Sequence, residues 1–308
     1  MLFLPQLILL NSPSLKEHLR AWLADPQGRD QYVTYRGDDV EIHWHGKPSQ
    51  CEVAYAKKVW LFNTPLHPLI PQQNWTELYA SWSPLGTYFA TLFRQGVRLW
   101  GGPSWEPQQR FAHPLVKLID FSPCENYLVT WSHDPITVPP NLPQGSEFFS
   151  PEDEGNNIAV WDIKSGHLLR TFPTTTYETD DPAMKKQMQW PALKWSSDDK
   201  FVARVTPGQQ ISIYELPSMG LHDKKSLKIE GVVDFEWCPL GDKDKEDAEK
   251  AAKAGKGAKK KENMLAYWTP EVSNQPARVT LISFPSRTVL RQKNLFNVTE
   301  VSFFSLSV

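Results

Sequence analysis

The chain has 308 residues, of which 40% are hydrophobic and 22% are charged, a composition typical of a globular protein and not of a disordered one. Its formal net charge is −2, so no overall electrostatic attraction draws it toward nucleic acid or an anionic membrane. Thirteen Trp and 26 Pro residues favour an all-β fold with aromatic strands and proline-bearing turns.

The first 29 residues combine an apolar segment with a short predicted helix. Residues 1–10 are almost entirely apolar, but they lack the basic start of a signal peptide and are about half as long as a bilayer span. Leu15, Leu19 and Leu23 share one helical face. The three cysteines are far apart and lack metal-binding spacing, which is typical of reduced thiols in a cytosolic protein. We therefore expect a cytoplasmic protein in which residues 1–29 form an apolar segment and a linker helix.

An aromatic residue followed by a turn recurs along the chain and is the main evidence for the fold. The motif occurs around Trp82, Phe121, Trp195 and Trp237, each time before a turn built from Ser, Pro, Gly or Asp. Two intervals are 39 and 42 residues, and the third, of 74 residues, contains a Pro- and Gly-rich loop. Four antiparallel strands fit one period of about 40 residues. The pattern predicts an all-β fold of the WD40-like β-propeller type.

Aromatic residues stand at the ends of the predicted strands and recur once in every repeat, as a core position of a blade does. We therefore expect these residues to pack in the blade cores and not to stack on nucleic-acid bases. The blade-core anchors are Trp82, Trp100, Phe121, Trp161, Trp195, Tyr214 and Trp237.

The repeats define an incomplete propeller over residues 30–308, with about four full four-stranded blades and partial blades at its ends. Residues 31–35 and 39–44 predict a hairpin that belongs to one partial blade. Inserts interrupt the repeats at 59–73, 132–156 and 242–262. A propeller removes its sheet edges by closing a ring, which so few blades do not achieve. We therefore expect exposed edges that need a partner.

The insert at 242–262 is acidic at its start and basic at its end. Its low complexity is typical of a solvated loop between two strands. Its clustered lysines also suit contacts with ribosomal RNA phosphates, driven by the release of counterions. Under that second interpretation the contacting residues are Lys253, Lys256, Lys259, Lys260 and Lys261.

The residue patterns do not predict an active site, a metal site or a cofactor site. His43 and His45 share a strand face, but no third ligand lies near them in sequence, which favours structural histidines. Asp198 and Asp199 have the context of polar turn residues and not of an acid–base pair. The sequence has neither a phosphate-binding glycine loop nor a G-x-S-x-G motif. We expect a protein that is not an enzyme and that uses no cofactor and no small-molecule substrate.

Several stretches together resemble one known family, the b subunits of eukaryotic translation initiation factor 3. In chain order they are DQYVTYRGDDVEIHWHGKPSQC at 30–51, WSPLGTYFAT at 82–91, LIDFSPCENYLVT at 118–130, NNIAVWDIKSGHLL at 156–169 and PARVTLISFPSR at 276–287. The resemblance implies a non-catalytic scaffold whose nine-bladed propeller lies against the small (40S) ribosomal subunit. It also implies a preceding RNA-recognition domain and a helical tail. The implied partners are other subunits of the factor, ribosomal RNA and ribosomal protein, with no membrane.

Residues 1–10, residues 59–73 and the last eight residues depart from that family, and we interpret the chain as a truncated or mis-spliced form or a short isoform. Two alternatives stay open. The apolar start, the Trp content and glycosylation-type triplets at Asn74 and Asn297 suit a secreted or endomembrane propeller that binds glycans. The second alternative is a different WD-type scaffold, such as initiation factor 2A. Co-sedimentation with small ribosomal subunits would favour membership of the initiation factor 3 complex, and a glycan-dependent mobility shift would favour the secreted protein.

Overall fold

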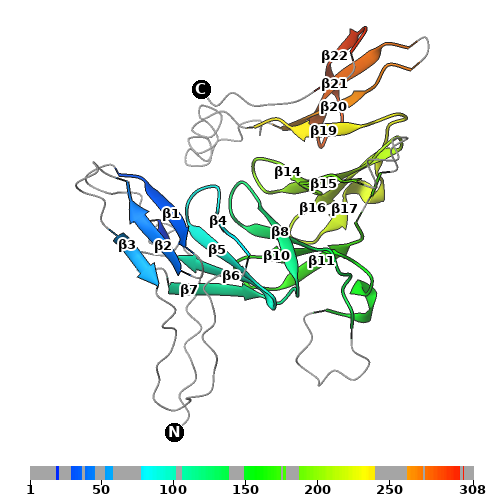
Figure 1. Cartoon of the computed structure of the whole chain (residues 1–308). Helices are drawn as coiled ribbons and strands as arrows, with labels where there is room; N and C mark the ends of the chain where they lie inside the picture. Colours follow the sequence, from blue (N-terminus) through cyan, green and yellow to red (C-terminus); the bar gives the residue numbers. More distant parts are fainter. Residues whose placement is uncertain are drawn as a thin grey trace, which may run out of the picture. The chain divides into compact units, whose positions relative to one another are not determined.

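The structure, a computed structural model, consists of antiparallel sheets with almost no helix in the part of the chain that it describes (Figure 1). The described residues are 19–20, 29–36, 39–45, 53–57, 78–101, 106–138, 149–174, 176–177, 187–239, 262–272, 275–298 and 301. They form five sheets of three or more strands and one two-stranded ribbon. The prediction of an all-β fold of the incomplete-propeller type is therefore confirmed.

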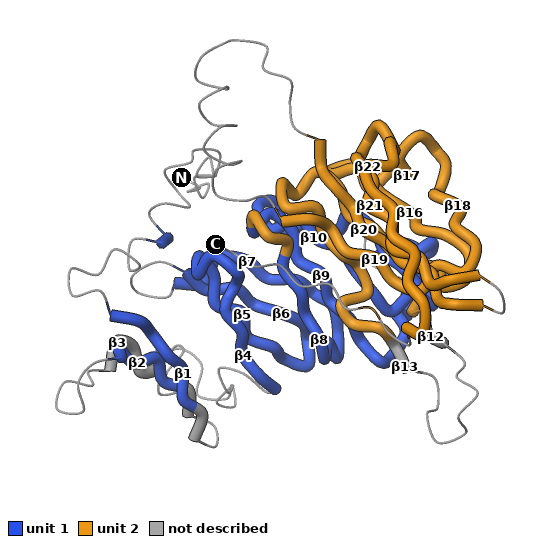
Figure 2. Tube along the Cα trace, turned by 90° about the horizontal axis from the view of Figure 1, so that it is seen from above, with its two compact units in different colours: residues 1–121, 125–173 blue, residues 122–124, 174–308 orange. Residues whose placement is uncertain are grey.

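The chain divides into two compact units, which Figure 2 colours separately. Unit 1 contains residues 1–121 and 125–173, and unit 2 contains residues 122–124 and 174–308. Each unit holds two consecutive sheets of the repeat. The division between residues 29 and 30 that the sequence indicated stays a prediction.

The two repeat sheets of unit 1 each have four antiparallel strands in chain order. The first contains β4 (Ala80–Trp82), β5 (Tyr88–Phe93), β6 (Gly96–Gly101) and β7 (Glu106–Phe111). The second contains β8 (Val116–Phe121), β9 (Tyr127–Ser132), β10 (Ile158–Asp162) and β11 (Leu168–Phe172). The inner strands β5, β9 and β10 are buried over nearly their whole length, whereas half of the residues of the outer strand β7 are exposed. Apolar runs such as IAVWD in β10 therefore reflect burial on both faces of an inner strand.

The hydrophobic core of unit 1 contains side chains from both repeat sheets. Leu92 and Phe111 of the first sheet cluster with Leu128 and Trp161 of the second, and all four are fully buried. The ring centroids of Phe111 and Trp161 lie 5.6 Å apart. Full burial of each such side chain stabilises the fold by roughly 1.5–3 kcal/mol. Apolar packing between the sheets is thus the main force that joins these two blades.

Unit 2 repeats this arrangement with two further sheets. The first contains β14 (Lys194–Trp195), β15 (Phe201–Thr206), β16 (Gln210–Glu215) and β17 (Gly220–Leu221), and β18 (Leu227–Lys228) also pairs with β16. The second contains β19 (Asp234–Trp237), β20 (Asn263–Thr269), β21 (Ala277–Phe284) and β22 (Val289–Leu295). A one-turn 3-10 helix, η3 (His222–Lys224), follows β17. The hydrophobic core of unit 2 contains side chains from both of these sheets, among them Ile211, Ile213, Phe235, Leu265 and Phe284.

Two smaller elements accompany the repeat sheets. β1 (Gln31–Arg36), β2 (Asp39–Trp44) and β3 (Val53–Lys57) form a three-stranded sheet, and β12 (Thr176–Tyr177) pairs with β13 (Gln187–Met188). β1 and β2 are the hairpin that the sequence predicted, with Gln31 opposite Trp44. Of the predicted N-terminal helix only Leu19 and Arg20 are described, and Leu19 is buried in the core of unit 1. The inserts at 59–73 and 242–262 lie outside the described residues, apart from Glu262.

The turn after the first strand has the same backbone form in three of the repeats. Gly86, Glu125 and Asp199 each stand three residues after a serine, and their φ angles are 72°, 56° and 55°. Only glycine adopts such positive φ values without steric cost, so each acidic residue carries about 1–2 kcal/mol of backbone strain. Both acidic residues use their carboxylates in contacts described below, which offset this strain.

Candidate functional site

A loop inserted between β9 and β10 has an ordered base in unit 1. The Ile136 N–H donates to the Asn156 carbonyl at 2.7 Å, and the Gly155 N–H donates to the Ile136 carbonyl at 2.9 Å. These bonds join the two arms of the loop, and the second arm carries the 3-10 helix η2 (Pro151–Asp153). The insert predicted at 132–156 therefore has a fixed base, whereas residues 139–148 lie outside the described part.

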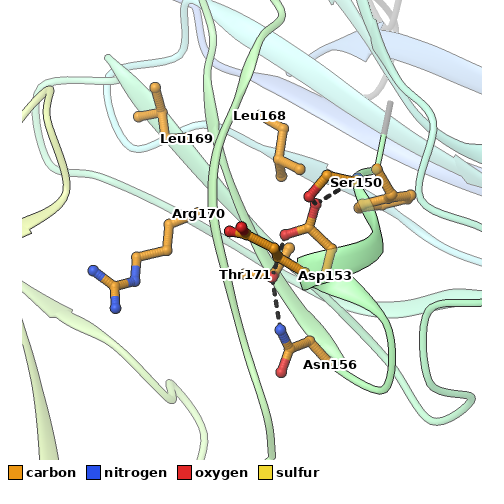
Figure 3. Close-up of a pocket in the computed structure, with 9 residues that line it drawn as sticks. Ser150, Asp153, Asn156, Leu168, Leu169, Arg170 and Thr171 are labelled. Carbon is orange, nitrogen blue, oxygen red and sulfur yellow. Dashed lines mark hydrogen bonds between the residues drawn. The ribbon is translucent and has the colours of Figure 1, made fainter. Parts of the chain in front are cut away.

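A cavity of about 650 Å³ lies between η2 and the outer strand β11 (Figure 3). One oxygen of the Asp153 carboxylate accepts hydrogen bonds from the Ser150 N–H at 2.7 Å and the Ser150 hydroxyl at 2.9 Å. The other accepts from the Thr171 hydroxyl at 2.6 Å, and the Asn156 amide donates to Thr171 at 2.8 Å. The lining residues are Phe149, Ser150, Glu152, Asp153, Asn156, Leu168, Leu169, Arg170 and Thr171.

The cavity joins an apolar wall to an acidic side. Phe149 and Leu168 are partly buried and pack against the core cluster of unit 1. Figure 3 shows Leu168 directed toward Ser150, while Arg170 extends away from the turn that carries Ser150 and Asp153. Glu152 is exposed beside Asp153. The arrangement presents oriented hydrogen-bond acceptors next to apolar surface, which suits a ligand with a donor group on an apolar stem.

A hydrogen-bonded trio holds the wall of the cavity from behind. The Trp161 indole N–H donates to the Thr130 hydroxyl at 2.9 Å, and His113 Nδ1 lies 2.8 Å from the same oxygen. Phe149 makes edge contacts with both His113 and Trp161, at ring-centroid distances of 5.7 and 5.8 Å. Burial lowers the pKa of His113 to about 4, so its imidazole is neutral at physiological pH. His113 Nε2 has no hydrogen-bond partner among the described residues.

A buried glutamate joins the two repeat sheets of unit 1. The Glu125 carboxylate accepts hydrogen bonds from the Ser83 hydroxyl, from the Leu85 N–H at 2.8 Å and from the Thr87 N–H at 3.3 Å. Its donors belong to the turn after β4, whereas Glu125 belongs to the turn after β8. Burial, together with the negative charge of Glu125, raises the pKa of Tyr88 to about 12. The acidic side chain at one turn thus fixes the corresponding turn of the preceding blade.

Asp199 makes the corresponding contact in unit 2. Its carboxylate accepts hydrogen bonds from the Ser122 hydroxyl at 2.6 Å and from the Cys124 N–H at 3.1 Å. Asp199 stands at the same position of its repeat as Glu125, and Ser122 stands at the same position as Ser83. Asp198 and Asp199 therefore lie in a turn, as the sequence indicated, and Asp199 also connects this turn to the one that contains Ser122 and Cys124.

A lysine joins the first strands of the two repeat sheets of unit 2. Lys194 Nζ lies 3.0 Å from both carboxylate oxygens of Asp234 and 3.0 Å from Glu236 Oε2, and it donates to the Phe235 carbonyl at 2.8 Å. The Trp237 indole N–H donates back to the Lys194 carbonyl at 3.0 Å. The Lys194 side chain is 13% exposed, whereas those of Asp234 and Glu236 are 27% and 41% exposed, so water partly screens this cluster.

The sequence-predicted anchors occupy corresponding strands of the repeats. Phe121, Trp195 and Trp237 are the last residues of the first strands and are buried, as are Trp100, Trp161 and Tyr214 on the third strands. Trp82 also ends a first strand but is only partly buried, and its ring contacts that of Phe89 at 4.9 Å. The lysines predicted to contact RNA all lie outside the described residues: Lys253, Lys256, Lys259, Lys260 and Lys261.

The histidines of the hairpin do not form part of a larger cluster in the described structure. His43 Nε2 lies 3.1 Å from the Thr34 hydroxyl and 3.1 Å from Glu41 Oε2, and its ring stacks on Tyr32. The described residues contain no group of three or more His, Cys, Asp or Glu side chains arranged to hold a metal ion. They also contain no helix with the length and hydrophobicity that crossing a membrane requires.

Sequence reasoning missed Glu125, Lys194 and His113. Aligning the turns SPLG, SPCE and SSDD would have placed Glu125 and Asp199 at one repeat position, where an acidic residue in place of glycine indicates a specific contact. The residues before the anchors, Lys194 and Glu236, also share a repeat position and have opposite charges. His113 lies in a short turn between β7 and β8 and has no such sequence signal.

Comparisons with known proteins point to one family. The B subunit of eukaryotic translation initiation factor 3 from Mycosarcoma maydis is 58% identical over 285 residues, covering 92% of this chain and 36% of that protein. The protein of the same name from Schizosaccharomyces pombe is 46% identical over 291 residues, covering 94% of this chain and 36% of that protein. No protein-family model matches the chain. These relatives do not favour a glycan-binding propeller or a different WD-type scaffold.

A solved structure described as "Crystal structure of the eukaryotic initiation factor" superposes with a TM-score of 0.58 at 19% sequence identity. The superposition covers 90% of this chain and 54% of the chain in the solved structure. The likeness concerns the fold, and with the repeated four-stranded sheets it defines a WD-type β-propeller protein. The chain belongs to the family of B subunits of eukaryotic translation initiation factor 3, and it spans about 36% of the length of the curated relatives described above.

Proposed function

We propose that this chain acts as a non-catalytic scaffold of the translation initiation factor 3 complex, in the cytoplasm. In this role it binds the small (40S) ribosomal subunit and other subunits of the factor during translation initiation. The observation that carries the proposal is the 58% identity to the B subunit of the factor from Mycosarcoma maydis over 285 residues. The match extends over 92% of the chain, so it includes all four repeats and is not confined to one blade.

The fold supports a scaffolding role on physical grounds. Blade-core residues such as Trp100 and Trp161 are fully buried, so loops and outer strands are attached to well-packed blade cores. Loops on a rigid framework can be recognised by several partners at once, because binding costs little conformational entropy in the framework. The outer strand β22 is mostly exposed and half of the residues of β7 are exposed, so both add further surface.

The lysines of the charged insert are the proposed contact with ribosomal RNA. Lys253, Lys256, Lys259, Lys260 and Lys261 lie within nine residues of one another in the sequence. Each lysine that neutralises a phosphate releases bound counterions, so the affinity should fall steeply with salt. This contact rests on the sequence, since all five residues lie outside the described part.

Sedimentation tests the proposal. The whole chain, mixed with purified small ribosomal subunits, should move with them in a gradient at about 50 mM salt and much less at about 200 mM. Replacing the five lysines of the insert with glutamine should weaken binding and reduce the salt dependence. A control with Lys224, Lys225 and Lys228 replaced, all exposed on unit 2, should behave like the unmodified chain.

A chain that stays at the top of the gradient at low salt would contradict ribosome binding. Affinity purification of the tagged chain from cells tests the second part of the proposal. Other subunits of initiation factor 3 should co-purify with it, and their absence would contradict the scaffold role.

A further inference from the structure

The cavity between η2 and β11 has the features of a prepared binding slot, and no step of the proposed scaffold function uses it. It exists because the turn between β9 and β10 is expanded by an insert, whereas the same turn between β5 and β6 consists of Arg94 and Gln95. The base of the insert is held by backbone hydrogen bonds at Ile136. The cavity that the described part of the insert and β11 line has a volume of about 650 Å³, which is within the size range of ligand sites.

We propose that this cavity docks an extended, basic segment of a partner protein, with one lysine or arginine side chain inside the slot. The proposal goes beyond the scaffold function and does not depend on ribosome binding. The partner is a polypeptide because the cavity borders β11, the last strand of its sheet, which pairs with β10 on one side among the described strands. An incoming extended segment can add to such a strand while its side chains enter neighbouring pockets.

The apolar wall fits the stem of a long basic side chain. Phe149 is held by edge contacts with His113 and Trp161, and Leu168 packs on the core of unit 1. The wall is therefore formed before a ligand arrives, which lowers the entropic cost of binding. Lysine and arginine bury their methylene stems along apolar surface while the charged end stays at a polar site.

The acidic side fits the charged end of the same side chain. Three hydrogen bonds, from Ser150 and Thr171, hold the Asp153 carboxylate in one orientation. Glu152 adds a second negative charge at the exposed rim, and Arg170 extends away from this turn in Figure 3. A charge-assisted hydrogen bond to a fixed carboxylate is stronger than one between neutral groups. The charge of the slot therefore favours a cation over an anion.

Fluorescence anisotropy with the whole chain tests the proposal. The probes are short labelled peptides of alternating valine and threonine whose central residue is arginine, lysine, leucine or glutamate. The arginine and lysine peptides should bind about tenfold or more tightly than the glutamate peptide, because they gain a charge-assisted contact worth at least ~1.4 kcal/mol. Equal affinity for all four peptides, or binding of none, would overturn the proposal.

Two charge reversals locate the contact on the surface. Glu152→Lys and Glu154→Lys make the same change in net charge at exposed residues two positions apart, but Glu154 does not line the cavity. We expect E152K to weaken the arginine peptide about tenfold and E154K to change its affinity less than about twofold. Equal losses would show general attraction to an acidic surface and would overturn the slot. Matching thermal melting curves of the two variants would show that both still fold.

Discussion

The two repeat sheets of unit 1 are joined by the carboxylate of Glu125, which accepts hydrogen bonds, whereas the two repeat sheets of unit 2 are joined at their first strands by Lys194, which donates them. Glu125 gathers one hydroxyl and two backbone N–H groups of the preceding turn. Lys194 gathers two carboxylates and a backbone carbonyl of the following strand. Both contacts bring a charged group close to several polar atoms of an adjacent blade.

The difference follows from single positions of the repeat. Gly241 stands in the fourth repeat where Glu125 and Asp199 stand in the second and third, so it offers no carboxylate to the blade before it. Thr91 and Thr130 accept hydrogen bonds from Trp100 and Trp161 in unit 1, at 2.8 and 2.9 Å. In the third repeat, which belongs to unit 2, Arg204 stands at the repeat position of Thr91 and Thr130, and Tyr214 stands at that of Trp100 and Trp161. Repeats that share a backbone can therefore join their blades with different side-chain chemistry.

Removal of Glu125 should have the largest effect on stability. Glu125→Ala leaves two buried donors, from Ser83 and Thr87, and the part-buried Leu85 N–H without their acceptor, and an unsatisfied buried group costs about 1–3 kcal/mol. We expect the free energy of unfolding to fall by about 4 kcal/mol, since the contacts are not fully additive. Urea denaturation followed by Trp fluorescence measures it. Glu125→Gln keeps one acceptor oxygen and should lose less than half as much, and a loss below about 1 kcal/mol for the alanine variant would contradict the assignment.

His113 should make unit 1 sensitive to acid. The folded protein holds the pKa of His113 at about 4, compared with 6.5 for an ordinary histidine. Between these values the unfolded chain binds a proton that the folded chain does not, so stability falls as the pH decreases. The loss approaches roughly 3 kcal/mol at pH 4. The pH profile of the unfolding free energy should be flatter for His113→Gln over this range, and parallel profiles for the two proteins would rule out the effect.

Replacement of Lys194 should have an intermediate effect. Lys194→Met leaves the carboxylates of Asp234 and Glu236 beside one another without their cation. We expect a loss of about 2 kcal/mol, less than for a fully buried pair, because the acidic side chains are 27% and 41% exposed and water screens them. Chemical denaturation of Lys194→Met, of Asp234→Asn and of the double variant measures the coupling. Simple additivity of the two losses would show that the residues do not interact.

The Lys200–Asp198 pair should matter least. Burial alone would raise the pKa of Asp198, but hydrogen bonds from Lys200 and Ser196 outweigh it and hold the pKa below its ordinary value. The pair therefore stabilises the fold above the ordinary pKa of Asp, and this contribution is lost as the pH falls through the lowered value. Because Lys200 is 47% exposed, Lys200→Met should cost less than about 1 kcal/mol at neutral pH. A thermal shift of many degrees would contradict this estimate.

The sequence predicted the repeats well because an aromatic residue before a turn recurs about every 40 residues, apart from one interval that holds an insert. Three of these aromatic residues are the last residues of first strands: Phe121, Trp195 and Trp237. It predicted the cavity poorly. The insert at 132–156 was visible only as a Pro- and Gly-rich interruption, and nothing in its composition shows that Asp153 bonds to Thr171. Such contacts depend on how a loop folds back on a distant strand, and local patterns do not report that. Glu125 was missed because its contact lies about one repeat away in the sequence.

Amide hydrogen exchange on the intact chain and on two variants tests most directly whether the two units use separate contacts to join their blades. In Glu125→Ala, exchange should accelerate at Leu85 and Thr87, whose N–H groups donate to Glu125, and should stay unchanged over 234–237. In Lys194→Met, exchange should accelerate over 234–237 and should stay unchanged at Leu85 and Thr87. Equal acceleration in both units for either variant, or no change at Leu85 and Thr87 in Glu125→Ala, would contradict the account.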